Sequence, residues 1–486
     1  MKLNKISLAV AAAIGVMSAP AHALLASSYT NASEFAGDTL NIRMSGATAQ
    51  DPGVLAATLR FCTANTMTAY SISNNFVYFC DINTSTLSGV TARGGVTPSK
   101  LALYKYSVGG SGSGVGFVNN ATAIPFLDLT KLAASCTANS ATADADGTAT
   151  NLSTYQAFSC TAASTSVTTN TLSYIGISDV EPQFFGSPST YNKLSSAGLA
   201  TVIFGVPVTK TAYNALQAAQ GLTVGSMTEA NMPSLTQAQI TSMYTQEGQT
   251  WAGLTGTEVN AADDTIYVAR RSATSGTQKT YEAVIARTLN STLGGRNCQT
   301  DVDAFVSGPE VLDNTVGNTA CDGRNTVVNG SGSGQVQFCL NKHNDAGRGA
   351  VGVQTTETKV STSTKFAFVK INGVAPTQAN VAAGKYTYYG DASINLRTGA
   401  TSPTASADNY TNFISKFKTA FADGAIINVI NGAPSPFGPA GVMALDNLAS
   451  PVPAADYTGA ESRNPWSRQV GGTVLNNCQP AKAANF

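Results

Sequence analysis

Short apolar runs alternate with amphipathic stretches along this chain, and small polar turns join them. Residues 265–269 are largely apolar and predict a buried strand, whereas 278–287 predict a helix. The residues between them, 271–277, read RSATSGT. A strand, a short polar turn and a helix start therefore follow one another here.

The same unit recurs in the first part of the chain. Residues 39–44 predict a strand, 45–50 a turn, and Asp51 with Pro52 the N-cap and first turn of a helix. Residues 101–106 predict a strand that runs into a Gly/Ser turn at 107–114. A fourth strand is expected over 171–177, with Ser178 and Asp179 at its end.

Strands that alternate with helices favour parallel α/β sheets, in which ligands bind beyond the carboxyl ends of the strands. The small polar turns all lie at such ends. Residues 137–169 and 290–341, rich in Ser, Thr, Asn and Gly, are interpreted as disulfide-pinned surface insertions. Within the second, 330–334 follows no clear strand and predicts a flexible loop. Residues 450–486 predict an irregular tail.

Composition narrows the class of protein. The 486 residues suggest two or three domains, or one two-lobed protein, and the 43% apolar fraction can build sizeable cores. Charged residues make up 12%, with 28 basic and 28 acidic side chains in balance. No basic cluster stands out, so nucleic acid is not an expected partner.

Residues 1–23 predict a secretory signal peptide. Lys2 and Lys5 form its basic region, an apolar core follows, and Ala21-His22-Ala23 fits a cleavage site. The core is too short to span a bilayer, although a short membrane anchor is the alternative, and no later stretch is long enough. The first mature residue would be Leu24 rather than the Cys of a lipoprotein. We therefore expect a soluble exported protein.

An even number of cysteines in an exported chain predicts disulfides. We expect near-neighbour pairs such as Cys62–Cys80 and Cys136–Cys160, and no C-x-x-C pair points to zinc or thioredoxin-type chemistry. The eight disulfide candidates are Cys62, Cys80, Cys136, Cys160, Cys298, Cys321, Cys339 and Cys478.

The mature chain has one histidine, His343, which we expect to be structural or exposed. A His-rich metal site is therefore excluded, and a Ser-His-Asp hydrolase would have to use that residue. Neither Ser111 nor Ser113 lies in a G-x-S-x-G elbow. We expect no catalytic residues, no cofactor and no metal.

The turn at 271–277 has the chemistry of an anion cradle. The first N–H groups of a helix lack intrahelical partners and carry partial positive charge. Ser275 and Thr277 add hydroxyl donors, and Arg271 adds a guanidinium suited to tetrahedral oxyanions. From these residues alone, an ordinary capped turn with a surface arginine is an equal alternative.

Taken in order, these segments resemble the periplasmic phosphate-binding proteins of high-affinity phosphate ABC importers. SGAT at 45–48 resembles the family's G-A-T turn, and VGGSGSG at 108–114 its G-S-G-G turn. GISDVEP at 176–182 resembles G-x-S-D-x-P, and 271–277 resembles R-x-x-x-S-G-T. The likeness runs from about 38 to about 453, apart from the two insertions, and three linking segments support it: 203–208, 235–244 with the downstream Trp251, and 347–353.

The resemblance implies an α/β, two-lobed periplasmic binding protein fold (type II), each lobe a mixed sheet flanked by helices, with disulfide-pinned insertions. The first lobe would comprise 24–203 plus 386–486, and the second 204–385. Implied phosphate ligands are Thr48, the backbone at Ala49, Asp179 and one of Ser111 and Ser113 from the first lobe, and Arg271, Ser275, Gly276 and Thr277 from the second. Which of the two serines binds stays open.

Two departures from the family pattern stand out. Ala49 and Gln50 follow the G-A-T turn where the family has an aromatic or bulky residue and then proline. Ala273 and Thr274 stand where the family often has Asp-Gly, so a carboxylate near Arg271 is missing. Affinity or anion choice is expected to depend on these positions.

The expected function is capture of inorganic phosphate by a monomeric exported protein, with an ABC permease as candidate partner. The expected location is the periplasm or outside the cell. One alternative is a secreted or cell-surface protein of the same fold that scavenges phosphate or adheres without an importer. Others are a phosphatase that uses Ser275 or Ser111, and a binder of molybdate or sulfate, against which Asp179 argues.

Overall fold

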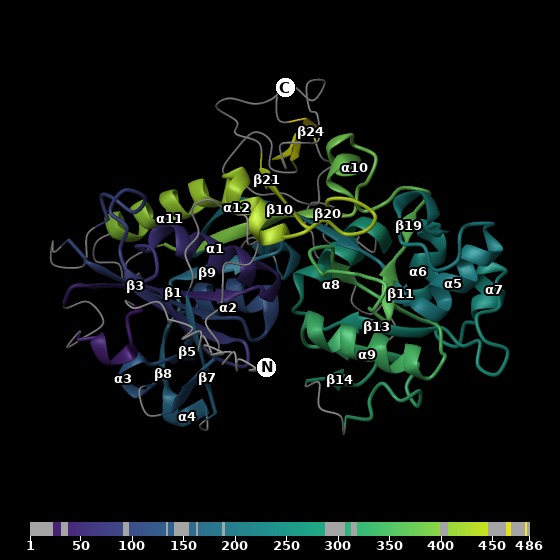
Figure 1. The fold of residues 1–486 in the computed structure, drawn as a ribbon, viewed down its shortest axis with the longest axis horizontal. Helices are drawn as coiled ribbons and strands as arrows, with labels where there is room; N and C mark the ends of the chain where they lie inside the picture. The colour runs from purple at the N-terminus through teal and green to yellow at the C-terminus, as the bar shows by residue number, and fades with distance from the viewer. Residues whose placement is uncertain are drawn as a thin grey trace, which may run out of the picture.

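The computed structural model folds the chain into two lobes, each built around its own mixed β-sheet and flanked by helices (Figure 1). The expected mixed α/β, two-lobed architecture is thereby confirmed. Residues 1–22 of the predicted signal peptide, Cys298, Cys478, and most of the 450–486 tail lie outside the described residues. The structure describes residues 23–30, 37–90, 97–132, 135–139, 155–161, 164–186, 190–286, 307–312, 318–398, 407–445, 463–467 and 482–483.

The first lobe contains a sheet of 12 strands. Its path across the sheet is β22 (Arg463–Asn464), β21 (Val442–Leu445), β10 (Leu194–Gly205), β20 (Tyr389–Arg397), β9 (Ile175–Ser178), β1 (Thr39–Gly46), β4 (Lys100–Tyr106), β3 (Asn75–Asp81), β2 (Thr68–Ile72), β7 (Gln156–Cys160) and β6 (Cys136–Ala138), with β17 (Gln354–Thr355) paired to β10 off this path.

The centre of this sheet brings three strand ends together. Strand β1 runs parallel to β4 on one side and to β9 on the other. Ser45 is paired with Tyr106, and Gly46 with Ile177, so the carboxyl ends of the three strands meet at one edge. The turns that follow them therefore lie close together, as the sequence predicts.

The second lobe contains a sheet of six strands. Their order is β14 (Glu310–Val311), β15 (Val327–Gly330), β13 (Tyr267–Arg271), β16 (Ala350–Gly352), β11 (Pro207–Thr209) and β18 (Phe366–Phe368). Strand β13 is parallel to both of its neighbours. Arg271, the last residue of β13, is paired with Gly330, so both strands end at the same level.

The chain passes between the two sheets at short connections. Strand β10 ends at Gly205 and β11 begins at Pro207. Strand β17 follows β16 and precedes β18 along the chain, but it pairs with β10 of the first lobe. Since β20 re-enters the large sheet at Tyr389, several segments join the lobes.

Helices cover the faces of both sheets (Figure 1). Helix α8 continues directly into a π-helix over Tyr281–Ala286. The helices are α1 (Asp51–Phe61), α2 (Gly110–Asn120), α3 (Leu129–Leu132), α4 (Ser164–Val167), α5 (Lys210–Ala219), α6 (Gln237–Thr245), α7 (Trp251–Thr255), α8 (Gly276–Thr280), α9 (Ser333–Asp345), α10 (Gln378–Ala382), α11 (Ala407–Phe421) and α12 (Gly424–Asn431). The remaining strands form two-stranded pairs: β5 (Ala123–Leu127) with β8 (Thr168–Leu172), β12 (Ser234–Leu235) with β19 (Lys370–Ile371), and β23 (Trp466–Ser467) with β24 (Lys482–Ala483).

Three local predictions were wrong. The Gly/Ser segment after β4 is mostly helix: α2 begins at Gly110, and Gly109 precedes it as a left-handed N-cap. The single strand expected over 171–177 is two strands, β8 and β9, in different sheets. Asp51 is the first residue of α1 rather than its N-cap, which is Gln50.

The interpretation of 290–341 as a surface insertion was also wrong for its described C-terminal part. Val327 and Val328 of β15 and Cys339 and Leu340 of α9 are buried in the main core. The segment 330–334 is the junction of β15 with α9 and not a free loop. Strand β15 has only four residues and polar residues flank it, so the hydrophobic pattern did not predict it.

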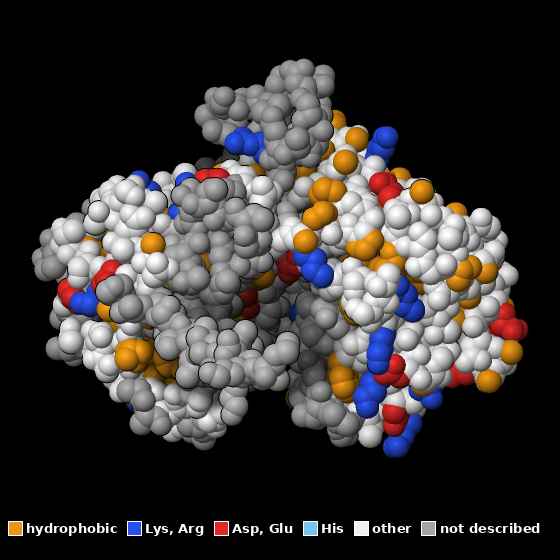
Figure 2. Space-filling model, viewed as in Figure 1, with side chains coloured by type: hydrophobic (Ala, Val, Ile, Leu, Met, Phe, Trp, Pro, Cys, Tyr) orange, Lys and Arg blue, Asp and Glu red, His pale blue; other side chains and the backbone are white. Residues whose placement is uncertain are grey.

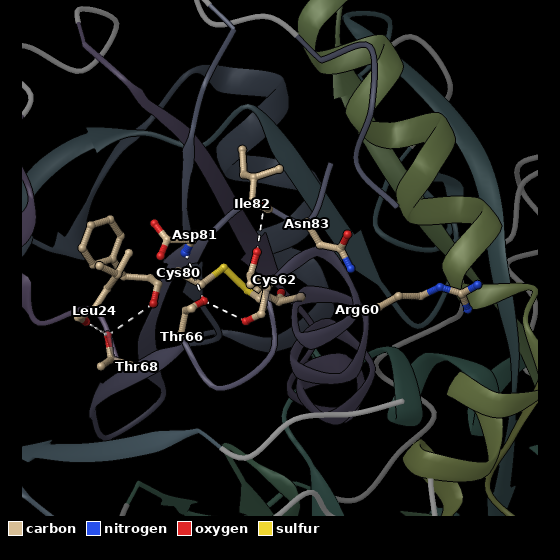
Figure 3. The surroundings of a disulfide bond; sticks show 12 residues. Leu24, Arg60, Cys62, Thr66, Thr68, Cys80, Asp81, Ile82 and Asn83 are labelled. Atoms are coloured by element: carbon tan, nitrogen blue, oxygen red, sulfur yellow. Dashed lines mark hydrogen bonds between the residues drawn. A yellow bond between two sulfur atoms is a disulfide. The ribbon is translucent and has the colours of Figure 1, made fainter. Parts of the chain in front are cut away.

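Both predicted disulfides are confirmed, and Cys321–Cys339 is a third among the described cysteines. The Cys62–Cys80 bond joins the end of α1 to β3 (Figure 3). Around it, the Thr66 hydroxyl accepts a hydrogen bond from the Asp81 N–H at 3.2 Å, and Thr68 donates to the Leu24 carbonyl at 2.6 Å. The disulfide therefore sits in a hydrogen-bonded corner of the first lobe.

Glycine allows helix α2 to lie directly on the sheet. A Cβ on Gly176 of β9 would lie 1.6 Å from the Gly114 carbonyl oxygen, and a Cβ on Gly114 would lie 2.2 Å from the Ile177 oxygen. Backbones can approach this closely only where side chains are absent. The start of α2 is thereby held against the ends of β1 and β9.

Among the described residues, no helix has the length and apolar character needed to cross a membrane.

The sequence left two possibilities for His343, a structural or an exposed histidine, and the structure confirms the first. It lies on α9, is 1% exposed, and stacks on Tyr267 with ring centroids 4.4 Å apart. Burial, with the nearby Arg348 charge, lowers its pKa from 6.5 to about 4. The imidazole is therefore neutral in the folded protein at neutral pH.

Acidification should destabilise the protein through His343. Between pH 6.5 and 4 the unfolded chain binds a proton that the folded chain does not, so the free energy of unfolding decreases as the pH is lowered. At pH 5 this loss is about 2 kcal/mol relative to neutral pH. Urea unfolding of wild type and His343→Phe at pH 7.5 and pH 5 should show the extra loss in wild type only. Equal losses in the two proteins would contradict the assignment.

Candidate functional site

The first lobe contributes a buried carboxylate with a neutral donor on each oxygen. Asp179 follows β9 and is 4% exposed. Gln50 Nε2 donates to Asp179 Oδ1 at 3.1 Å, and Ser111 Oγ donates to Oδ2 at 3.0 Å. The Ser111 hydroxyl also accepts from the Asp179 N–H at 3.1 Å. Three turns that are distant in sequence therefore meet at one side chain.

The second lobe contributes Arg271, which is 3% exposed at the end of β13. Its Nε donates to the Gly330 oxygen and its Nη2 to the Ser331 oxygen, both at 3.2 Å. Its Nη1 donates to Ser333 Oγ at 3.1 Å. Because a guanidinium has five N–H donors, two remain for another acceptor.

The two lobes touch at this point. The Gly112 N–H of α2 donates to the Thr274 oxygen at 2.8 Å. A Cβ on Gly276, the first residue of α8, would lie 2.5 Å from Ser111 Oγ and 2.8 Å from Asp179 Cβ. A Cβ on Gly110 would lie 3.9 Å from Arg271 Nη2. The starts of α2 and α8 thus face each other, with Asp179 and Arg271 on opposite sides.

Figure 2 shows the surface of the two lobes from the same side as Figure 1, with a hollow between them.

The start of α8 has the donor pattern that the sequence predicts. Ser275 is the N-cap, and its side-chain oxygen accepts from the Gln278 N–H at 3.5 Å. Thr277 is completely buried, and its hydroxyl has no hydrogen-bond partner among the described residues. Because a buried hydroxyl without a partner is energetically costly, Thr277 is a candidate donor to a ligand.

The structure separates the roles of the two candidate serines. Ser111 contacts Asp179, as described above. The Ser113 hydroxyl instead donates to the Gly110 carbonyl at 2.7 Å, within the first turn of α2. Ser111 is therefore the serine that faces the acidic side chain and the second lobe.

Thr48 and Ala49 lie in the short 3-10 turn Thr48–Gln50, directly after β1. Ala49 is buried and Thr48 is partly exposed. The Gln50 contact with Asp179 brings this turn to the site. Thr48 and Ala49 are thus near the other candidate residues through the backbone of one turn.

Electrostatics distinguishes Arg271 from the neighbouring buried cations. Lys105 pairs with Asp51 at 3.0 Å, and Lys279 pairs with Glu282 at 2.9 Å. Within the described part of the chain, Arg271 has no carboxylate within 4.0 Å. Burial lowers its pKa to about 10, and the Asp179 charge opposes that change.

For Asp179, burial and the neighbouring groups shift the pKa in the opposite directions from those for Arg271. Burial raises the pKa of its carboxyl group, while the hydrogen bonds from Gln50 and Ser111 and the charge of Arg271 lower it. The site therefore combines a guanidinium, the first N–H groups of α8 and hydroxyls with one acceptor. It can hold an anion that also has a proton to donate.

Sequence reasoning missed several residues that support the site. Lys105 is completely buried, and its Nζ lies 2.9 Å from the Gly46 oxygen and 2.6 Å from Ser107 Oγ. It holds the turn after β1 together with Asp51. A lysine inside an otherwise apolar strand was the available signal. Ser331 and Ser333 were missed because strand β15 was not predicted.

No group of three or more His, Cys, Asp or Glu side chains suited to a metal ion occurs among the residues whose structure is described. The carboxylates at the site pair with lysine, amide and hydroxyl groups instead. The site residues thus have the chemistry of anion binding.

Comparison with family models found no match, and comparison with curated proteins found none either. Solved structures that resemble the chain include a protein from Clostridium perfringens assigned as a phosphate ABC transporter substrate-binding protein, with bound phosphate (13% identity, 80% of this chain and 96% of that chain, TM-score 0.42). Others are an ABC-type phosphate transport receptor from Vibrio cholerae (16%, 80% and 98%, TM-score 0.39) and PstS from Borrelia burgdorferi (11%, 81% and 96%, TM-score 0.35).

Proposed function

We propose that this chain is an exported solute-binding protein that captures inorganic phosphate between its two lobes and delivers it to an ABC importer. One observation carries the proposal. Arg271 is buried at the junction of the lobes without a carboxylate partner among the described residues, unlike Lys105 and Lys279. A compensating anion would stabilise a buried charge of this kind.

The donors around Arg271 suit a tetrahedral oxyanion. Two guanidinium N–H groups, the first N–H groups of α8 and the partnerless Thr277 hydroxyl can each donate to an anion oxygen. Ser275, Gly276 and Ser111 line the same junction. Thr48 and the Ala49 N–H complete the proposed set from the turn after β1.

Asp179 would select among oxyanions. An ionised carboxylate can only accept hydrogen bonds, and phosphate at neutral pH carries at least one proton to donate. Sulfate has no proton, so one of its oxygens would face the buried carboxylate. Such a like-charge contact costs several kcal/mol, or roughly a thousandfold in affinity.

The connections at β10, β17 and β20 would act as the hinge of a two-lobed binder. Closure would exclude water and strengthen the hydrogen bonds to the anion. The closed form would be the one recognised by a membrane permease. The protein would act in the periplasm as a binding protein, without catalysis.

The alternative without an importer, a secreted or cell-surface phosphate scavenger or adhesin, would use the same site. Cell fractionation separates the two: periplasmic protein fits import, and protein in the medium or on the surface fits the alternative.

Titration calorimetry tests binding directly. The mature protein should bind phosphate and arsenate, and sulfate about a thousandfold more weakly. Arg271→Gln should weaken phosphate binding by about a hundredfold or more, because the buried anion loses the guanidinium charge of the second lobe. Arg324→Gln, which removes a 77% exposed arginine, is the matched control and should bind as wild type. Absence of heat with phosphate in the folded wild-type protein would overturn the proposal.

Asp179→Asn should relax discrimination and leave phosphate binding measurable. An amide can donate to a sulfate oxygen, so the ratio of sulfate to phosphate dissociation constants should fall by about tenfold or more. Asp345→Asn removes an exposed carboxylate and serves as control. An unchanged ratio in Asp179→Asn would remove Asp179 from the selective role.

Gly276→Ala should impair closure. The added methyl group would lie 2.5 Å from Ser111 Oγ and 2.8 Å from Asp179 Cβ, so the lobes would have to separate. Overpacking of this kind costs about 1–3 kcal/mol, which predicts a phosphate dissociation constant raised about tenfold or more. Gly116→Ala, where a Cβ meets no atom within 4 Å, is the control. Wild-type affinity in Gly276→Ala would show that the lobes do not meet here when phosphate is bound.

A further inference from the structure

The side chain of Gln50 makes a buried contact to which the proposed function assigns no role. Gln50 is 1% exposed, and its backbone is fixed by a hydrogen bond from its N–H to the Ala47 oxygen at 3.3 Å. It occupies the N-cap position of α1, yet its side chain makes no capping bond. Its amide instead donates to Asp179 Oδ1 at 3.1 Å. A buried side chain is thus committed to one carboxylate oxygen.

Asp179 has one neutral protein donor on each oxygen. Ser111 accepts from the Asp179 N–H, so its own hydroxyl proton is directed to Oδ2. Gln50 Nε2 can only donate. A carboxylate offers about four acceptor positions, so each oxygen keeps room for a proton from a ligand. Both contacts favour the ionised carboxylate and hold it in one orientation.

We infer that Gln50 is a specificity-determining positioning residue. It keeps Asp179 ionised and oriented, and so sets the pH range over which the site rejects tetrahedral oxyanions that carry no proton. This inference rests on the proposed function for its ligand class. It assigns to Gln50 a role that the resemblance to phosphate-binding proteins does not imply, since the family has a different residue there.

The charges around Asp179 make an additional neutral donor useful. Arg271 from the second lobe and Lys105 from β4 favour the ionised form. Asp51 at the start of α1 and Glu357, just after β17, are acidic groups whose charges interact with that of Asp179. Burial raises the pKa of Asp179, as it raises that of Glu357 to about 8. Hydrogen bonds from Gln50 and Ser111 oppose this effect locally.

Gln50→Met tests the inference, because methionine has similar length and no donor. Dissociation constants for phosphate and sulfate should be measured by calorimetry from pH 8 to pH 5. In wild type, sulfate binding should strengthen only when Asp179 becomes protonated. In Gln50→Met this rise should begin about one pH unit higher. Gln246→Met, the same change at an exposed position, should follow wild type.

The same onset pH in Gln50→Met and wild type would overturn the inference, because removal of a donor that favours the ionised carboxylate must raise the onset. Gln50→Glu is a second variant that remains informative if methionine disturbs folding. Two carboxyl groups in contact share a proton, so sulfate binding should then appear at higher pH than in wild type. Rejection of sulfate by Gln50→Glu with wild-type pH dependence would also count against the inference.

A readout without ligand separates this inference from the proposed function. Carbon-13 NMR of the Asp179 carboxyl group, assigned by its absence in Asp179→Asn, reports the titration in the free protein. A higher midpoint in Gln50→Met supports the link, and an unchanged midpoint removes it. If wild type binds neither phosphate nor arsenate, the proposed function fails, and the titration still decides whether Gln50 controls Asp179.

Discussion

The central constraint in this molecule is the burial of Arg271 and Asp179 on opposite sides of one junction. A charge removed from water costs several kcal/mol unless polar groups replace the lost hydration. The protein satisfies Arg271 with two carbonyl oxygens and a serine hydroxyl, and Asp179 with an amide and a serine hydroxyl. Each charge is thus solvated mainly by neutral groups of its own lobe. The attraction between the two charges remains for whatever enters between them.

That arrangement depends on how closely backbones approach. Gly114 and Gly176 let α2 lie against β9, and Gly276 lets the start of α8 reach Ser111 and Asp179. A methyl group at any of these positions would overlap a backbone or side-chain atom of the opposing element. Helix starts are useful for anion binding only when their N–H groups can approach the anion. The glycines therefore serve the site by setting distances, whereas the polar residues supply its chemistry.

Much of this could be predicted from the sequence because each strand–turn–helix unit is local. The β1 and β13 units and strand β4 were recognised from their apolar strands and polar turns, and the two short-range disulfides from cysteine spacing. The residues that were missed depend on long-range contacts. Gln50 and Asp179 are 129 positions apart, and Arg271 and Ser333 are 62 apart, so no local pattern connects them. The strand β15 was missed because its four residues include an asparagine and a glycine.

The departures at Gln50 and Ala273 change how the two buried charges are balanced. With alanine at 273, the contacts of Arg271 are carbonyl oxygens and the Ser333 hydroxyl, so its charge is not neutralised from within its own lobe. With glutamine at 50, Asp179 gains a neutral donor, which favours its ionised form against the effect of burial. With both changes, the charges of Arg271 and Asp179 remain available to interact with a ligand and are not paired at short range with counterions among the described residues. Under the proposed function, attraction would come from donors that any tetrahedral anion can use, and selection from one acceptor whose ionised form the surrounding amide and hydroxyl favour.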